Sequence, residues 1–416
     1  MDNKKGRAFE YVHKLQVLIG SVNQTHYGSF GILSNAINRL KINCSSQVVS
    51  ESDPYAEFWM GTHPSGPSAV RQSGELLSAW IAQHNEALSA GEKETFAGNL
   101  SFLFKALSVK TALSIQAHPS KTHAEELHKL RPDLYKDDNH KPEIVVPCFG
   151  PFEALCGFRP SDEVKAYFNL IPELATLVTQ SIANELLVAE SETEKEEALK
   201  NAFTALMNCP DETLKNVSSA FITRLVNEGE KVEDCLPDLY LRISEDFPGD
   251  IGCFCIYFLN YVVLQPGEAM FLGPNIPHAY ISGDCLECMA CSDNVVRAGL
   301  TPKYKDVETL CNMLSYKQSK ADVYKERWVR ENDWTECCTP PVPDFALARI
   351  KVDTSGEFAL IPRPNASLLI VIEGEAELNG DKIGFGTVLF LRCEEELVLK
   401  VGRDSSFTAY QAFSNV

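Results

Sequence analysis

The stretch GCFCIYFLNYVVLQPGEAMFLGPNIPHAYISG, residues 252–283, decides the fold class, because Pro-Gly and Gly-Pro turns punctuate its β-branched and aromatic runs. Two other stretches are built in the same way, EIVVPCFGPFEALCGF at 143–158 and SLLIVIEGEAELNGDKIGFGTVLFL at 367–391. In the last of these, Asn379-Gly380 follows an alternating segment and is a strong signal for a hairpin turn. Short strands at even spacing are typical of a jelly roll or barrel, so the sequence predicts a mainly β protein.

A helical segment separates the β-rich regions. The chain from 163 to 226 lacks glycine, and apolar residues recur there at helical spacing, for example Leu199, Phe203 and Leu206. The Glu-rich run at 189–200 is typical of a solvated helix face. We therefore expect three parts along the chain. They are a first β domain formed by 1–160 and 246–330, a helical insertion at 161–245, and a second β domain at 331–416.

Charge and hydropathy narrow the class of protein. The 416 residues include 38 basic and 57 acidic side chains, so the formal net charge is 38 − 57 = −19. This balance argues against a nucleic-acid or anionic-membrane partner. No apolar run approaches the roughly 20 residues of a membrane span, and the first 20 residues do not resemble a signal peptide. We expect a cytoplasmic monomer whose 14 cysteines are free thiols.

Three cysteines form a C-x2-C-x2-C run at Cys285, Cys288 and Cys291. Such a run can hold zinc or an iron–sulfur cluster, but no fourth cysteine follows at close spacing, since Cys311 lies 20 residues further on. The alternative is that these are small buried residues of a sheet. The residues themselves leave both interpretations open.

Four polar stretches stand out from the apolar strands. In SIQAHPS (114–120), Gln116 and His118 are two residues apart, so on a strand both side chains project from one face, as two ligands of one metal would. The other three stretches are YKDDNHKPE (135–143), which ends in Glu143, PNIPHAYISG (274–283), which contains His278, and SDNVVRAGLTPK (292–303), which contains Arg297 and Lys303.

These stretches carry a family resemblance. YKDDNHKPE and HAYISGDCLECMACSDNVVRAGLTPK (278–303) resemble the two signatures of the type I phosphomannose isomerases. PYAEFWMGTHPSGPS (54–68) and LSFLFKALSVKTALSIQAHPSKTHAE (100–125) agree with the same family. The resemblance implies a cupin (jelly-roll) catalytic domain and a second, C-terminal cupin-like domain. The three cysteines of 285–291 fall on positions that the family pattern leaves free.

The resemblance also implies a cofactor. Carried over residue by residue, it assigns one zinc ion to Gln116, His118, Glu143 and His278. Two imidazoles, one carboxylate and one amide oxygen would leave a local charge of about +1 around a divalent ion. Nitrogen and oxygen ligands with room for water or substrate suit Lewis-acid chemistry, although they would also accept manganese or cobalt.

The implied reaction interconverts mannose 6-phosphate and fructose 6-phosphate by proton transfer through a cis-enediolate, which would feed mannose into GDP-mannose and glycosylation. Arg297 is too basic to move a proton at neutral pH, so we expect it to hold the phosphate or stabilise enediolate charge. The other expected catalytic residues are Lys141, Glu287, Asp293 and Lys303. The expected substrate-binding residues are Lys105, Ser114, Tyr280 and Glu57.

One departure from the family pattern keeps a rival hypothesis open. The family commonly carries a Tyr-x-Trp-Gly element near the N-terminus, and the corresponding segment here, VNQTHYGSFG (22–31), has no Trp. The rival hypothesis is a catalytically weak cupin that binds a sugar phosphate and has a regulatory role. An isomerase assay with and without a chelator distinguishes the two.

Overall fold

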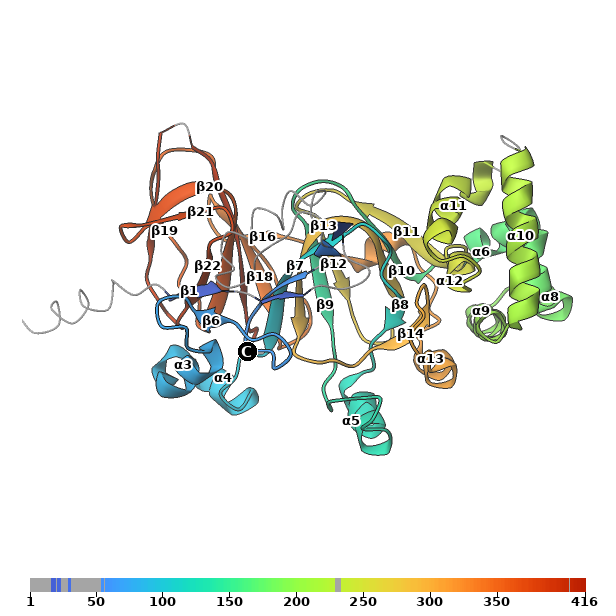
Figure 1. Ribbon diagram of the computed structural model, residues 1–416, viewed down its shortest axis with the longest axis horizontal. Coiled ribbons are helices and arrows are strands. Elements are labelled where there is room, and N and C mark those ends of the chain that lie inside the picture. The colour runs from blue at the N-terminus through green and yellow to red at the C-terminus, as the bar shows by residue number, and fades with distance from the viewer. Residues whose placement is uncertain are drawn as a thin grey trace, which may run out of the picture.

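The computed structural model describes residues 57–228, 233–403 and 405–416 in full, together with the backbone of four short segments nearer the N-terminus (Figure 1). Those segments are β1 (Gln16–Ile19), β2 (Ser21–Asn23), β3 (Ser29–Phe30) and β4 (Pro54–Tyr55). The side chains of 22–31, where the expected Trp is missing, lie outside the described residues.

The central β unit is organised around its longest strand, β13 (His278–Ala290), which takes part in two layers. The first part of β13 pairs with β8 and β10, and from Gly283 onward it pairs with β7 and β9. Gly283 has φ +113°, and a Cβ there would lie 2.7 Å from the carbonyl oxygen of Pro151, so this crossing requires glycine. The other strands are β2, β5 (Glu57–Met60), β7 (Phe102–Val109), β8 (Ile115–Ala117), β9 (Glu143–Pro147), β10 (Phe152–Phe158), β11 (Leu259–Leu264), β12 (Ala269–Leu272), β14 (Val296–Gly299) and β15 (Lys325–Glu326).

Alternation along these strands separates a polar interior from an apolar outer face. Phe104 of β7 and Leu286 of β13 pack in one core with Leu368 of the C-terminal unit. The next residue on each strand, Lys105 and Glu287, lines the interior instead. One face of the central sheet therefore holds the two β units together, while the other is free to carry chemistry.

The C-terminal β unit repeats this plan around β20 (Ser367–Leu378). The first part of β20 pairs with β22 and β24, and its last part pairs with β21 and β23. The N-terminal strand β1 pairs with β22, and β6 then pairs with β1, so this sheet includes segments from both ends of the chain. The strands are β6 (Ala69–Val70), β16 (Val329–Arg330), β17 (Thr335–Cys338), β18 (Ala346–Val352), β19 (Gly356–Ala359), β20, β21 (Asp381–Gly384), β22 (Val388–Leu391), β23 (Val398–Val401) and β24 (Phe407–Phe413).

A helical layer covers the side of the central unit that faces away from the C-terminal unit (Figure 1). Its core continues into the strands, because Phe203 and Phe221 share one apolar cluster with Leu155 and Val296. Ser191 and Glu194 form a capping box at the start of the Glu-rich helix. The helices are α6 (Ser161–Leu170), α7 (Pro172–Val178), α8 (Gln180–Val188), α9 (Glu192–Met207), α10 (Asp211–Glu228), α11 (Pro237–Asp246) and α12 (Gly252–Cys255).

The predicted fold class, β-rich units with a helical insertion, is confirmed, whereas the domain boundaries after 160, 245 and 330 stay predictions. The prediction of strand at the start of the 252–283 stretch is wrong, because Gly252–Cys255 forms α12. All four residues are buried, and a fully buried apolar run has no periodicity that separates strand from helix.

None of the described helices combines the length and apolar character that crossing a membrane requires. Smaller helical elements are α3 (Leu77–Gln83), η2 (Asn85–Ala87), α4 (Ala90–Thr95), α5 (Lys121–Leu130), α13 (Val307–Met313) and η4 (Ala321–Tyr324).

Candidate metal centre and cavity

The interior of the central β unit opens into a cavity of about 330 Å³. Every predicted catalytic and substrate-binding residue lines it, although these residues come from segments far apart in the sequence. They are Glu57, Lys105, Ser114, Lys141, Tyr280, Glu287, Asp293, Arg297 and Lys303. The cavity thus places a cluster of charged side chains inside a β fold, where an apolar core would otherwise be expected.

Two imidazoles converge on one carboxylate beside this cavity. His118 Nε2 lies 3.2 Å from Glu143 Oε1, and His278 Nε2 lies 3.3 Å from Glu143 Oε2. Each of the three side chains is only 1% exposed. Among the His, Cys, Asp and Glu residues that the structure describes, these three form the group whose ligand atoms can meet at one metal ion.

Hydrogen bonding fixes which imidazole nitrogens are available to a metal. His118 Nδ1 lies 2.7 Å from the carbonyl oxygen of Asn294, and His278 Nδ1 lies 2.8 Å from that of Ile276. A carbonyl oxygen only accepts, so each Nδ1 carries the proton and each Nε2 presents a lone pair. Both Nε2 atoms are buried and have no hydrogen-bond partner among the described residues. A lone pair facing a carboxylate oxygen is repulsive unless a cation lies between them, so the three residues fit a metal ion.

The protonation states agree with this interpretation. Burial lowers the pKa of His118 to about 4, so its imidazole is neutral, as a metal ligand must be. Burial alone would raise the pKa of Glu143, but the charge of Lys141 holds it well below its ordinary value. Lys141 Nζ lies 3.0 Å from Glu143 Oε1. The carboxylate therefore stays charged inside the protein.

Gln116, the remaining predicted ligand, lies on β8 in register with His278 on one side and Arg297 on the other. Its side chain lines the cavity. The sheet therefore places one amide, one imidazole and one guanidinium residue side by side across three strands. This register brings the expected metal ligands next to Arg297, which the sequence separates from Gln116 by more than 180 positions.

A second charged group lies on the opposite layer of the cavity. Lys105 Nζ lies 2.9 Å from Glu287 Oε2 and 3.5 Å from Glu57 Oε2. Burial lowers the pKa of Lys105, but these two carboxylates outweigh it and raise the pKa above its ordinary value. The Tyr280 hydroxyl donates to Glu287 Oε1 at 2.8 Å, and the Trp59 indole donates to Glu57 Oε2 at 2.6 Å. The cavity therefore holds a protonated amine fixed between oriented carboxylates.

Arg297 and Lys303 differ from the other cations of the cavity. Lys105 and Lys141 are each paired with a carboxylate, whereas the side chains of Arg297 and Lys303 make no hydrogen bond or ion pair with the described residues. Burial lowers the pKa of Arg297 without approaching neutrality, since a guanidinium stays charged in proteins. This end of the cavity therefore carries positive charge that no described carboxylate neutralises.

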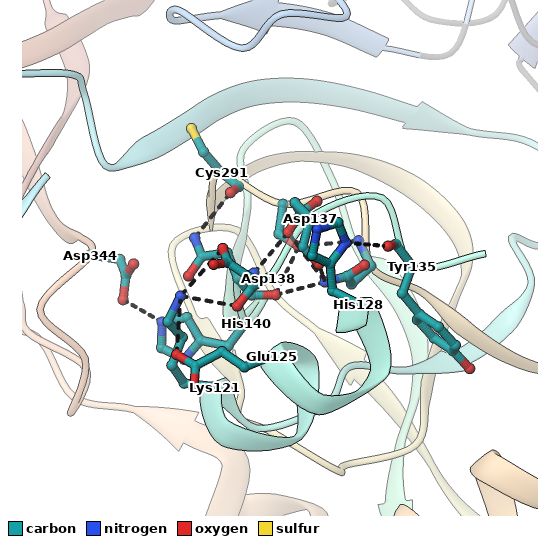
Figure 2. A network of polar contacts seen from close by, with 12 residues as sticks. Lys121, Glu125, His128, Tyr135, Asp137, Asp138, His140, Cys291 and Asp344 are labelled. Carbon is teal, nitrogen blue, oxygen red and sulfur yellow. Dashed lines mark hydrogen bonds and ion pairs between the residues drawn. The ribbon is translucent and has the colours of Figure 1, made fainter. Parts of the chain in front are cut away.

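Asp137 orders the segment that precedes Arg297. Its carboxylate accepts from the Ser292 hydroxyl at 2.7 Å and from the Asp293 amide at 2.7 Å. The Asn294 side chain donates to the Asp137 carbonyl at 2.7 Å, and the Asn294 carbonyl in turn receives His118 Nδ1. Figure 2 shows Asp137 in this polar network, with His140 reaching Asp344 of the C-terminal unit. Asp137 was not among the predicted site residues, although its place in the 135–143 signature could have indicated it.

The cysteine run does not form a metal site in the described part of the chain. Cys285 packs in the interior cluster, whereas Cys288 packs in the core shared with the C-terminal unit, on the other face of β13. Cys291 Sγ lies 3.7 Å from the Leu100 carbonyl oxygen. Cys285 and Cys288 therefore cannot approach one ion, and the interpretation as small buried sheet residues is the correct one for both.

Comparison with family models supports the resemblance. Residues 15–161 match the catalytic domain of type I phosphomannose isomerase, and residues 174–259 match the helical insertion domain of the same family. The mannose-6-phosphate isomerase of Homo sapiens is 40% identical over 409 residues, which cover 94% of this chain and 96% of that protein. The chain belongs to the type I phosphomannose isomerase family. The prediction of an enzyme of the isomerase class is thereby confirmed.

Other relatives support the assignment of this chain to the phosphomannose isomerase family. The mannose-6-phosphate isomerase of Bos taurus is 41% identical over 397 residues, covering 91% of this chain and 94% of that protein. A crystal structure of mannose 6-phosphate isomerase bound with zinc and yttrium superposes with a TM-score of 0.82 at 30% identity, covering 97% of this chain and 100% of that one. A single-residue mutant of the Salmonella typhimurium enzyme gives the same TM-score, identity and coverage.

Proposed function

We propose that this chain interconverts mannose 6-phosphate and fructose 6-phosphate, with one zinc ion held by Gln116, His118, Glu143 and His278. The observation that carries the proposal is the buried His118–Glu143–His278 group, whose two unpartnered Nε2 atoms face one carboxylate beside a charged cavity. Solved relatives of the same family are described as zinc-bound. When bound, zinc supplies a divalent charge that stabilises negative charge developing on substrate oxygens.

The phosphate group is assigned to the Arg297 end of the cavity. Arg297 and Lys303 are the cavity cations that lack a carboxylate partner among the described residues, so an anion is the ligand that would balance them. The planar donor fork of a guanidinium suits a phosphate. An acidic protein can therefore hold an anionic sugar, because this pocket concentrates positive charge that the net charge of −19 does not reveal.

Proton transfer between C1 and C2 of the sugar proceeds, in this proposal, through a cis-enediolate. Lys141 and Glu287 are the deepest candidates to move the proton, since both are buried and line the cavity. Asp293 lies at the rim, where its side chain is 47% exposed and 3.6 Å from His63 Nε2. Burial keeps the pKa of Tyr280 well above its ordinary value, so its phenol stays protonated and orients Glu287. Glu57, Lys105 and Ser114 line the remaining wall and are assigned to the sugar.

The wider setting is part of the same proposal. The product, mannose 6-phosphate, would feed mannose into GDP-mannose and glycosylation. We propose that the enzyme is a monomer and acts in the cytoplasm. Size-exclusion chromatography with light scattering tests the oligomeric state, and a mass near that of two chains would contradict it.

Conversion of fructose 6-phosphate to mannose 6-phosphate tests the function. Zinc-loaded protein should turn over, and a chelator should abolish turnover until zinc is restored. If zinc-loaded protein binds fructose 6-phosphate without turnover, the proposed isomerase activity is refuted. That result would favour the catalytically weak cupin with a regulatory role. Metal analysis of protein purified without added metal decides between zinc, manganese and cobalt.

A further inference from the structure

The loop that follows β14 forms the positively charged end of the cavity. Arg297 lies on β14, and Leu300, Thr301 and Lys303 follow it, and all four line the cavity. The loop is not held in a regular conformation, because Leu300 has φ +53°, in the left-handed region that L residues rarely adopt. Such a conformation persists only where neighbouring structure enforces it.

The Asp250 carboxylate supplies this enforcement from the helical side. One of its oxygens, Oδ1, accepts from the Leu300 amide at 2.7 Å and from the Gly252 amide at 2.7 Å. The other, Oδ2, accepts from the Thr301 amide at 3.4 Å. One carboxylate thus joins two consecutive amides of the cavity loop to the start of α12. Charged acceptors make stronger hydrogen bonds than neutral ones, so this clamp favours the strained turn.

Two glycines bring the backbones into direct contact at the same point. A Cβ on Gly299 would lie 2.6 Å from Gly252 Cα, and a Cβ on Gly252 would lie 2.6 Å from the Leu300 nitrogen. No larger residue fits at either position without displacing the loop. The segment between α11 and α12, which lies within the residues matched by the helical insertion model, therefore packs on the loop backbone itself.

The loop is anchored elsewhere as well, but at its ends. Arg297 pairs with Gln116 of β8, and the Tyr135 hydroxyl donates to Asp306, which caps α13, at 2.8 Å. Asp250 acts between these two anchors, at the turn that directs the chain from Arg297 toward Lys303. Thr301 transmits the restraint, since its hydroxyl accepts from the Lys303 amide at 3.1 Å.

We propose that Asp250 is a positioning residue that sets the phosphate end of the cavity, so that the helical layer contributes to substrate affinity without touching the substrate. This inference rests on the proposed assignment of the phosphate to Arg297 and Lys303. It predicts that loss of the carboxylate weakens binding of the phosphate group and leaves the metal site, which lies on other strands, intact.

The experiment compares Asp250→Ala and Asp250→Asn with the control Asp246→Asn, an exposed acidic residue of the same segment. Calorimetry with inorganic phosphate gives Kd, kinetics with mannose 6-phosphate give KM and kcat, and metal analysis gives zinc per chain. For Asp250→Ala we expect KM and phosphate Kd to rise together by about 10-fold, with zinc unchanged and kcat within about 3-fold. Asp250→Asn keeps one acceptor oxygen and should show a smaller rise, and Asp246→Asn should match the wild type.

Unchanged KM and phosphate Kd in Asp250→Ala would overturn the proposal, as would a fall in kcat alone. If Asp250→Ala does not fold, Asp250→Asn carries the test, and a phosphate Kd equal to that of Asp246→Asn would overturn it. The proposed function fails separately, if zinc-loaded wild type does not convert mannose 6-phosphate. In that case the difference in phosphate Kd between the Asp250 and Asp246 variants still measures the clamp.

Discussion

The two β units of this protein lie side by side (Figure 1). They share a plan of strand pairing and differ in the side chains that they enclose. Each is organised around one long strand that changes partners at a glycine, β13 at Gly283 and β20 at Gly374. Gly374 has φ +76°, and a Cβ there would lie 1.8 Å from the Ser406 carbonyl oxygen, so neither crossing tolerates a side chain. The shared glycine shows that the plan depends on backbone geometry and not on the contents of the barrel.

The interiors of the two β units differ in polarity. The interior of the C-terminal unit is an aliphatic cluster that includes Leu369, Val371, Leu389 and Leu399. The interior of the central unit holds buried lysines, glutamates and histidines around a cavity. Burying charged groups is costly even when they are paired, and an aliphatic interior stabilises the same architecture without that cost. The buried charges of the central unit therefore need a reason beyond stability, whereas the aliphatic interior of the C-terminal unit needs only packing.

The largest expected effect follows from removing a metal ligand in the central unit. His278→Ala or Glu143→Ala should release the zinc and abolish isomerase activity, because the remaining side chains cannot complete the coordination. Metal analysis and the isomerase assay, run on the same preparation, check this. The matched control is Cys291→Ser, which should keep both zinc and activity. Stoichiometric zinc in both ligand variants would refute the assignment.

Arg297→Ala is the next most severe change. We expect a loss of about 100-fold or more in kcat/KM with zinc fully retained, because a charge-assisted contact to the substrate is removed while the ligands stay in place. Steady-state kinetics and metal analysis measure the two effects separately. An unchanged rate would rule out a role for Arg297 at the phosphate or the enediolate.

The C-terminal unit should respond in stability and not in chemistry. Leu389 is fully buried opposite Leu369, so Leu389→Ala should lower the free energy of unfolding by about 2–5 kcal/mol. The specific activity of the folded protein should stay at the wild-type level. Val398→Ala, at a side chain that is 45% exposed, is the control and should change stability little. Denaturant titration beside the isomerase assay tests this, and a loss of specific activity in folded Leu389→Ala protein would show that the C-terminal unit takes part in catalysis.

The smallest effect separates two buried tyrosine hydroxyls. Tyr280→Phe removes the donor to Glu287, and Tyr316→Phe removes a donor to the Cys311 carbonyl at 2.8 Å, outside the cavity. Each should lose about 1 kcal/mol of stability, since each deletes one hydrogen bond. Only Tyr280→Phe should also lower kcat/KM, by about 10-fold. Equal kinetics in the two variants would mean that Tyr280 does not orient a working Glu287.

Local patterns in the sequence anticipated much of the fold. The Asn379-Gly380 turn joins β20 to β21, with φ +49° and +93° at its two residues, as a hairpin of this type requires. The helical insertion followed from the absence of glycine and the spacing of Leu199 and Phe203, which are both buried. Pairing between distant segments did not follow. The pairing of β1 with β22 joins the two ends of the chain, and periodicity reports which face is buried but not which strand lies beside it.

In the candidate site, too, local patterns were predictable from the sequence and contacts between distant segments were not. The spacing of Gln116 and His118 indicated a shared face, and the signatures named the residues that line the cavity. Of the groups that hold those residues, Asp137 lies inside the 135–143 signature, whereas Asp250 lies in no motif of the sequence. Asp137 acts on residues 155 or more positions away, and Asp250 acts on Leu300 across 50 positions. A loop aspartate outside any motif, such as Asp250, has no local pattern that distinguishes a clamp from a solvated surface charge.

We propose above that the buried His118–Glu143–His278 group holds the ion on which activity depends. Zinc titrated into metal-free protein, with conversion of fructose 6-phosphate measured at each addition, tests it most directly. Activity should rise in proportion to bound zinc and reach its maximum at one ion per chain. Full activity in metal-free protein with a chelator present would contradict a metal-dependent role for this group.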